Sequence, residues 1–103
     1  HLDLTGNNLR GTMPRELGEL RALSSLHLWN NTLTGSIPKA LGGLHGLKTL
    51  WLNHNQLAGT IPQELGNCVG LTELWLCENS LEGPIPPVLG KLGALEQLML
   101  WGN

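Results

Sequence analysis

Aromatic side chains are almost absent from this sequence. It contains no Phe and no Tyr, and its aromatic residues, all of them Trp, make up 4% of the chain. A globular core normally combines aromatic and branched side chains that fill an irregular interior at high density. Hydrophobic residues nevertheless account for 41% of the chain, and most of them are Leu. A core built almost entirely from one residue type predicts a regular, repeated environment.

Charge of either sign is also scarce. Six Lys and Arg residues stand against eight Asp and Glu residues, which gives a net charge of −2. A nucleic-acid-binding surface needs a basic face that neutralises phosphates, and anionic lipid needs a polybasic segment. No apolar run approaches the ~18 residues of a membrane-spanning helix. We therefore expect no nucleic-acid partner and no direct membrane contact by this chain.

A period of 24 residues runs through the whole chain without an insertion or deletion. It shows first in two leucine columns, Leu2, Leu26, Leu50, Leu74, Leu98 and Leu4, Leu28, Leu52, Leu76, Leu100. An asparagine column follows, which is Asn7, Asn31, Asn55, Asn79 and Asn103. Glycine and proline columns come next, namely Gly11, Gly35, Gly59, Gly83 and Pro14, Pro38, Pro62, Pro86. Such periodicity indicates a repeat protein, in which stacked repeats bury a shared core.

Each column has a physical role. In the LxL segment two leucines flank an outward residue, as in a half-buried strand. The asparagine side chain carries amide donors and an acceptor at the point where the chain leaves the strand, so we expect a ladder of hydrogen bonds to backbone groups along the stack. Pro and Gly interrupt helices. The return segments are therefore predicted to be irregular or 3₁₀ rather than long α-helix.

The pattern LxxLxLxxNxLxGxIPxxLGxL occurs over residues 23–44, 47–68 and 71–92. It resembles the plant-type leucine-rich repeat, and the LxGxIP element at 33–38 distinguishes that class from other leucine-rich repeats. Three departures are Met13 in place of Ile, Cys68 in place of Leu, and Pro84 before Ile85. The resemblance implies an α/β leucine-rich-repeat solenoid, a right-handed superhelix. Short parallel strands would line one face, and a second set of extended segments would form at LxGxI.

We assign the whole chain, residues 1–103, to one array of about four repeats. The repeats span approximately residues 2–25, 26–49, 50–73 and 74–97, with a partial repeat at 98–103. Solenoids carry polar capping repeats at their ends, and this sequence shows no cap. It is therefore expected to be an excerpt from a longer array.

The two cysteines, Cys68 and Cys77, lack the CxxC spacing of a metal or redox motif. Cys68 occupies a core position of a return segment, where a small hydrophobic side chain fits. Cys77 lies two positions after Trp75 and is predicted to face outward as an exposed thiol. Because the two positions point to opposite sides of the solenoid wall, we expect no disulfide between them.

Two outward-facing columns hold all four tryptophans. The inner column, between the two leucines, is Asp3, His27, Trp51, Trp75 and Met99. The outer column, after the second leucine, is Thr5, Trp29, Asn53, Cys77 and Trp101. Neighbouring strands lie about 4.8 Å apart, so Trp51 and Trp75 should be side by side, with Trp29 and Trp101 on the diagonals. The sequence predicts one connected aromatic patch.

This patch has two interpretations. Trp favours strands and cross-strand aromatic pairs stabilise sheets, so the tryptophans could be purely structural. A contiguous exposed apolar patch more often marks an interaction site, and Trp is enriched among binding hot spots. We predict that this face is slightly negative and that it binds a protein or peptide whose apolar and basic side chains serve as anchors. Its residues are His27, Trp29, Trp51, Asn53, His54, Glu73, Trp75, Glu78, Met99 and Trp101.

Asn30 begins an N-x-S/T sequon, Asn30-Asn31-Thr32. This motif is an acceptor for N-glycosylation when a chain is secreted. Asn30 adjoins Trp29, so a glycan there would shade part of the patch. We predict Asn30 as the glycosylation site.

Catalytic chemistry has little support. His54, Cys77 and Glu78 can be imagined as a Cys-His pair or a zinc site, but an open sheet offers no cleft and no evident oxyanion donors. One Cys, one His and one Glu also fall short of a closed four-ligand zinc set. Phosphate loops and dinucleotide fingerprints are missing. We expect no enzymatic activity, no cofactor and no metal.

The resemblance implies a parent protein of a particular kind: the ectodomain of a leucine-rich-repeat receptor-like kinase or receptor-like protein. Such a parent lies outside the plasma membrane or is secreted, and binds a protein or peptide ligand, with a co-receptor as a further partner. A secreted inhibitor of a cell-wall enzyme belongs to the same family. The alternative is an intracellular array attached to a GTPase or kinase, where the repeats serve assembly. Asn30 favours the first interpretation, and an exposed Cys77 favours the intracellular one.

Overall fold

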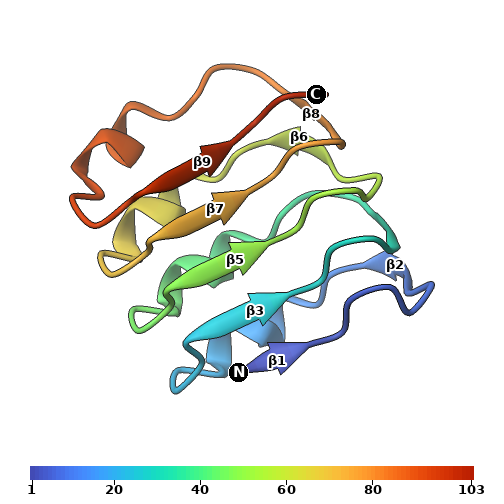
Figure 1. Ribbon diagram of the computed structural model, residues 1–103, viewed down its shortest axis with the longest axis horizontal. Coiled ribbons are helices and arrows are strands. Elements are labelled where there is room, and N and C mark those ends of the chain that lie inside the picture. The colour runs from blue at the N-terminus through green and yellow to red at the C-terminus, as the bar shows by residue number, and fades with distance from the viewer.

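The main sheet of the protein consists of five short parallel strands in the order β1-β3-β5-β7-β9 (Figure 1). The computed structural model describes residues 1–103. The strands are β1 (Leu2–Asp3), β3 (Ser25–His27), β5 (Thr49–Trp51), β7 (Glu73–Trp75) and β9 (Gln97–Met99). One strand of this sheet therefore forms at each LxL segment, as predicted.

In-register pairing aligns the leucines of successive repeats. Leu26 pairs with Leu50, and Leu50 pairs with Leu74. All three are fully buried. Because side chains alternate across a strand, the residue after each of these leucines lies on the opposite face. The sheet thus places equivalent outward residues of neighbouring repeats directly beside one another.

A second set of strands forms at the LxGxI segments. β2 (Arg10–Thr12) pairs with β4 (Thr32–Thr34), and β6 (Ala58–Thr60) pairs with β8 (Ser80–Glu82). Gly35, directly after β4, has a φ of 73°, a left-handed conformation that favours glycine. A Cβ there would also lie 2.8 Å from the Thr12 side chain. All four glycines of this column have a left-handed φ of 73–81°, which explains the column, and close packing is a second reason at Gly35.

The return segments contain short 3₁₀ helices, which confirms that prediction. They are η1 (Arg15–Glu19), η2 (Lys39–Gly43), η3 (Gln63–Asn67) and η4 (Pro87–Lys91). Each follows a residue of the proline column directly. A Cβ on Gly42 would collide with the carbonyl group of Glu64, so glycine allows helices of adjacent repeats to touch. None of the helices has the length and apolar character needed to cross a membrane.

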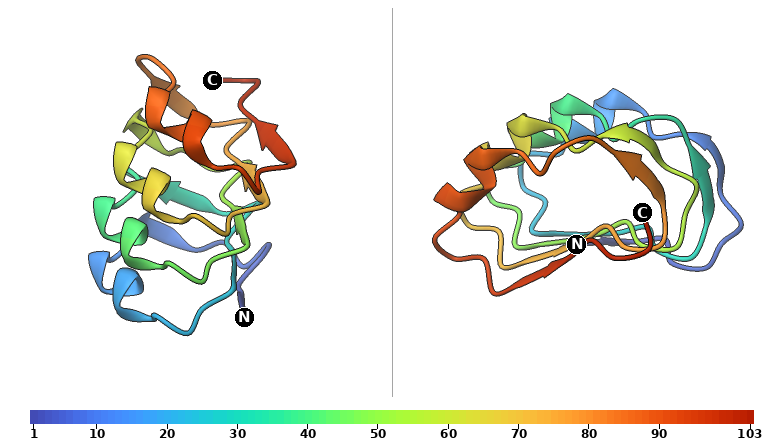
Figure 2. Two further views of the ribbon diagram at one scale, coloured as in Figure 1. Left: turned by 90° about the vertical axis from the view of Figure 1, so that its left-hand side faces the viewer. Right: turned by 90° about the horizontal axis from the view of Figure 1, so that it is seen from above.

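Each repeat is a flattened loop with the main sheet on one side and the 3₁₀ helices on the other (Figure 2). The leucine core fills the space between them. Cys68 belongs to this core, is fully buried, and donates its thiol hydrogen to the Leu41 carbonyl oxygen at 3.4 Å. Burial raises the pKa of the Cys68 thiol to about 11. The predicted core position of Cys68 is confirmed, and both cysteines are free thiols.

The asparagine column forms the predicted ladder. Asn31 Nδ2 donates to the carbonyl oxygens of Leu4 and Leu28, both at 3.0 Å. Its Oδ1 accepts from the backbone N–H groups of Asn7 and Leu9 at 3.0 and 2.9 Å. Each asparagine also contacts the carbonyl oxygen of the outer-column residue two positions earlier. The distance is 3.1 Å for Thr5 and 3.3–3.4 Å for Trp29, Asn53, Cys77 and Trp101. The ladder therefore holds the outer column where the regular strands have ended.

Candidate functional site

The inner column forms a continuous stack across the main sheet. Backbone register pairs His27 with Trp51 and Trp51 with Trp75. The rings of His27 and Trp51 lie 8° from parallel with centroids 3.9 Å apart, and those of Trp51 and Trp75 lie 7° from parallel at 4.4 Å. Met99 continues the column as the register partner of Trp75. The strand register thus brings four of the predicted binding residues together.

Glu73 anchors the centre of this stack. Trp51 Nε1–H donates to Glu73 Oε2 at 2.9 Å. The Nε1–H of Trp75 is buried without a hydrogen-bond partner. Both tryptophans and Glu73 remain half-buried. Part of each side chain therefore stays accessible to a ligand.

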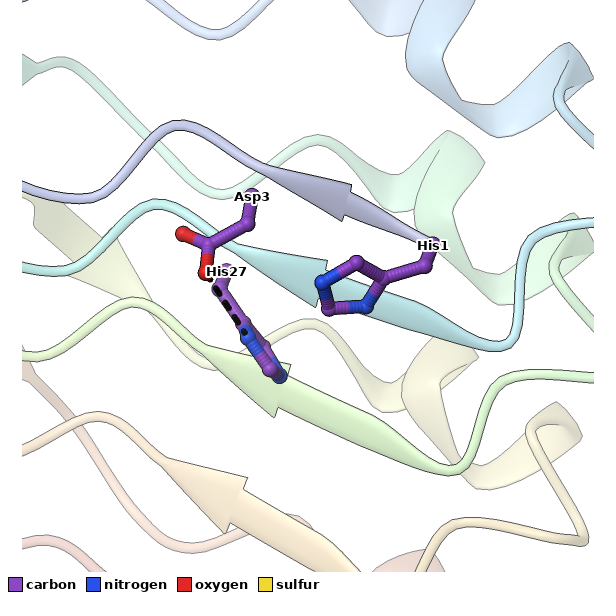
Figure 3. A group of neighbouring side chains, drawn as sticks. All are labelled: His1, Asp3 and His27. Carbon is purple, nitrogen blue, oxygen red and sulfur yellow. Dashed lines mark ion pairs between the residues drawn. The ribbon is translucent and has the colours of Figure 1, made fainter.

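His27 is more enclosed than the sequence indicates. It is 9% exposed, although we predicted it as a surface binding residue. Trp51 covers one face of its ring, and His1 approaches edge-on with centroids 5.1 Å apart. Its Nε2 lies 2.8 Å from Thr49 Oγ1, and its Nδ1 lies 3.8 Å from Asp3 Oδ2 (Figure 3). Neighbours on both adjacent strands therefore enclose this imidazole.

The outer column does not stack. Trp29 is half-buried and Trp101 is 59% exposed, while Asn53 and Cys77 between them are buried. All ring contacts of Trp51 and Trp75 are within the inner column, and the only ring contact of Trp101 is with His54. The aromatic surface is therefore a stack flanked by two separate tryptophans rather than one set of touching rings.

The prediction of an exposed Cys77 thiol is wrong, because this residue is 2% exposed. His54 and Trp101 come from the repeats on either side of Cys77, and their ring centroids are 6.4 Å apart. Two strand spacings of about 4.8 Å would separate them further, so the rings lean together over the intervening repeat. Burial raises the pKa of the Cys77 thiol, and the negative charge of Glu78 acts in the same direction.

Asn53 was predicted to face outward and is likewise buried, at 7% exposure. Its Oδ1 is buried without a hydrogen-bond donor. The physical reason matches that for Cys77: a short side chain in a column of large rings is covered by its neighbours. Asn53 therefore contributes to the shape of the face and is not one of its exposed groups.

The position after the outer column has a left-handed backbone in every repeat. Its φ values are 56° at Asn30, 52° at His54 and 53° at Glu78. All three residues are exposed at the edge of the sheet face. We did not predict this conformation, although glycine at Gly6 and Gly102 of the same column was a signal for it. The turn presents two predicted binding residues and the candidate glycosylation residue to solvent.

The imagined trio of His54, Cys77 and Glu78 is not a reactive site. A nucleophilic or metal-binding cysteine needs an accessible thiolate, whereas Cys77 is buried with a raised thiol pKa. Metal-ligating side chains gather elsewhere, at the β1 end of the sheet. Ligand atoms of His1, Asp3 and His27 lie within 4.8 Å of one another (Figure 3). We missed this group because His1 precedes the inner column and only the folded chain brings its ring beside His27.

The face as a whole is open and slightly negative. Four outward columns cross the sheet, beginning at His1, Asp3, Thr5 and Gly6 and repeating every 24 residues. Asp3, Glu73 and Glu78 supply carboxylates there, and no Lys or Arg occurs in the four columns. Hollows occur on other sides, such as one lined by Pro62 and Pro84 near the 3₁₀ helices. Small-molecule sites are usually concave. This face therefore suits an extended chain or a protein surface better than a small molecule.

Comparisons with known proteins agree with this architecture. The family profile described as leucine rich repeat matches residues 1–57 and 21–81. The ectodomain of the plant membrane receptor kinase GASSHO1/SCHENGEN3 from Arabidopsis thaliana, solved in complex with CASPARIAN STRIP INTEGRITY FACTOR 2, is 47% identical with a TM-score of 0.98. That match covers 100% of this chain and 12% of the ectodomain chain. A comparison with curated proteins gave no match.

Two further solved structures are similar. The Arabidopsis receptor kinase HAESA, in complex with the peptide hormone IDA and the co-receptor SERK1, is 39% identical with a TM-score of 0.88, over 90% of this chain and 16% of that one. A plant ice-binding protein is 38% identical with a TM-score of 0.88, over 99% of this chain and 33% of that one. The chain thus spans a minor part of each protein. By its profile match, its fold and its LxGxIP repeats, the chain belongs to the leucine-rich-repeat family and is of the plant type.

Proposed function

We propose that this chain is a non-enzymatic binding segment of a plant-type receptor ectodomain, and that its main-sheet face takes an extended peptide. One observation carries the proposal: the strand face presents accessible tryptophan rings that the leucine core does not need. Trp51 and Trp75 are half-buried, and Trp101 is 59% exposed. Exposed Trp is enriched among residues that dominate binding energy.

The charge of the face favours a ligand with basic and apolar side chains. Glu78 is exposed and Glu73 half-exposed, and no basic side chain of the columns neutralises them. Arg or Lys of a peptide can pair with these carboxylates and lie against a tryptophan ring by cation–π contact. Bulky apolar side chains can cover the remaining ring surface. An extended chain crossing several strands would meet both kinds of group.

The similar structures support this proposal without deciding it. HAESA was solved with a peptide hormone and a co-receptor, and GASSHO1/SCHENGEN3 with CASPARIAN STRIP INTEGRITY FACTOR 2. The similar ice-binding protein illustrates that one fold can carry different functions. Peptide binding is therefore inferred from the exposed rings and carboxylates of this chain itself.

The alternative of an intracellular array has lost its support. It rested on an exposed Cys77, which is a liability in an oxidising compartment, and Cys77 is buried. An extracellular location and glycosylation of Asn30 remain part of the proposal. Asn30 is exposed at the edge of the face, where a glycan can be accommodated.

Panning a random peptide library displayed on phage against the immobilised chain tests the proposal. We expect enriched peptides to combine Arg or Lys with bulky apolar residues. Trp101→Ala should weaken their binding by about tenfold or more with the urea unfolding midpoint unchanged, because Trp101 is largely exposed. His45→Ala, at an exposed position two residues after the end of η2, is the control and should bind normally. Failure to enrich peptides, or equal binding by Trp101→Ala and Trp51→Ala variants and the parent chain, would refute peptide binding at this face.

A further inference from the structure

Three side chains of the kinds that bind transition metals meet at the β1 end of the main sheet. They are His1, Asp3 and His27, and one ligand atom from each lies within 4.8 Å of the other two. Figure 3 shows the three gathered on one side of β1 and β3. This group adjoins the proposed peptide-binding face, because the His27 ring stacks on Trp51. It contains no tryptophan, and a metal titration without peptide tests it independently.

Asp3 has one oxygen held and one free. Its Oδ1 accepts hydrogen bonds from the hydroxyl group of Thr5 at 2.6 Å and from the backbone N–H of Thr5 at 3.0 Å. Two hydrogen bonds to one oxygen fix the orientation of the carboxylate and leave Oδ2 toward His27. The same bonds lower the pKa of the Asp3 carboxyl group.

The imidazole of His27 is oriented in the same way. Thr49 Oγ1 lies 2.8 Å from Nε2, and the Trp51 ring stacks on one face of the imidazole at 3.9 Å. When Nε2–H donates to the threonine oxygen, the neutral tautomer leaves the Nδ1 lone pair directed toward Asp3. A hydrogen bond that fixes the tautomer of a ligating histidine is a regular feature of metal sites.

The spacing of the two fixed atoms suits a shared ion. His27 Nδ1 and Asp3 Oδ2 are 3.8 Å apart, too far for a direct hydrogen bond. Two ligands that each lie about 2.0–2.1 Å from a tetrahedral zinc ion are about 3.3 Å apart, so a small approach would close the pair around a metal. His1 is exposed and stands edge-on to His27, from where its ring can supply the third ligand.

We propose that His1, Asp3 and His27 bind a divalent transition-metal ion such as zinc. Two imidazoles and a carboxylate favour zinc over calcium or magnesium, which prefer oxygen ligands. Three protein ligands leave one tetrahedral position open to solvent. An ion held there places a positive charge at the β1 end of a face that is otherwise slightly negative.

Isothermal titration calorimetry with zinc chloride tests this site. For the titration the chain is prepared with an acetylated N-terminus, so that a free amino group beside His1 does not bind the ion. We expect one zinc per chain, and no comparable heat from calcium chloride. His27→Gln and Asp3→Asn should each weaken zinc binding by at least about tenfold, and Thr49→Val, which removes only the orienting hydroxyl group, by about tenfold.

His45→Gln is the matched control, because it removes an exposed histidine outside the group. Circular dichroism of each variant checks that the fold is kept. Asp3→Asn should disturb the fold least, because Asp3 is exposed. Addition of Co²⁺ supplies a second readout, since an intense visible absorption band appears only for a tetrahedral site. The site is disproved by the absence of zinc binding, by normal zinc binding in the Asp3→Asn and His27→Gln variants, or by an equal loss in His45→Gln.

Discussion

The inner and outer columns run side by side over the same sheet face, and each contains two tryptophans. In the inner column Trp51 and Trp75 are register partners and stack at 4.4 Å. In the outer column Trp29 and Trp101 are separated by two short, buried side chains and have no ring contact with each other. Tryptophan therefore has two roles on this face. It stacks where the next repeat has a tryptophan at the same position, and it stands alone where the next repeat has a short side chain there.

The two columns also differ in what positions them. Inner-column residues lie within strands, so the sheet register places them directly. Outer-column residues lie beyond the strand ends, and their carbonyl groups are contacted by the asparagine ladder, as Cys77 is by Asn79 at 3.3 Å. We conclude that the inner column stabilises the sheet through its own rings. The outer column depends on the ladder and leaves Trp101 largely exposed.

Breaking the ladder should have the largest effect. Asn79 Nδ2 donates to the carbonyl oxygens of Leu52 and Leu76, and its Oδ1 accepts from the Leu57 N–H. Asn79→Ala leaves the buried Leu57 N–H without a partner, at a cost of about 1–3 kcal/mol. Leu52 and Leu76 keep the Nδ2 donors of Asn55 and Asn103, so the two bonds lost there cost about 1 kcal/mol each, and we expect a total loss of about 3 kcal/mol in the free energy of unfolding. Urea denaturation followed by circular dichroism measures it.

Asn53→Ala is the matched control for the ladder. Asn53 is as buried as Asn79, but its side chain makes no hydrogen bond and its Oδ1 has no donor. Its removal should change the free energy of unfolding by less than about 1 kcal/mol, because no partner is orphaned. Equal losses in the two variants would show that the outer column does not depend on the ladder.

Removing one ring from each column should separate the structural role of the inner rings from that of the outer rings, with a smaller effect on stability. Trp51→Ala removes two stacked contacts and the hydrogen bond to Glu73, which should cost about 1–3 kcal/mol. Trp101→Ala removes a largely exposed ring and should cost less than about 0.5 kcal/mol. Thermal and urea unfolding of both variants provide the measurement. A Trp101→Ala variant as unstable as Trp51→Ala would remove the distinction between the columns.

The fold could be predicted because its causes are local and repeated. The leucine, asparagine, glycine and proline columns each act through one repeated contact, so a 24-residue period indicated strands, ladder and 3₁₀ turns together. Register then followed from alignment alone, and it placed Trp51 beside Trp75 correctly. Repetition thus substitutes for the long-range information that a sequence normally lacks.

The face could be predicted only in part, because its residues do not repeat. Alternation assigns each side chain to a face but not its exposure, which depends on the size of the side chains beside it. Cys77 and Asn53 are short and lie among rings, so they are buried on the outward face. His1 joins His27 across a column boundary. The left-handed turn at His54 and Glu78 also lay outside a simple strand pattern.

The smallest effect concerns the cover over Cys77. If His54 and Trp101 lean over this thiol, it should react slowly with 5,5′-dithiobis(2-nitrobenzoic acid) in the native chain at about pH 8, because only an accessible thiolate reacts. Cys68 should not react with the reagent, because it is fully buried and has a thiol pKa of about 11. Trp101→Ala should speed the labelling of Cys77 several-fold while stability is kept, whereas Trp29→Ala should not.

A rate for Trp101→Ala equal to that of the parent chain would mean that the sheet itself, and not the exposed tryptophan, buries the thiol. The short side chains of the outer column would then be positioned by the sheet itself, as the rings of the inner column are.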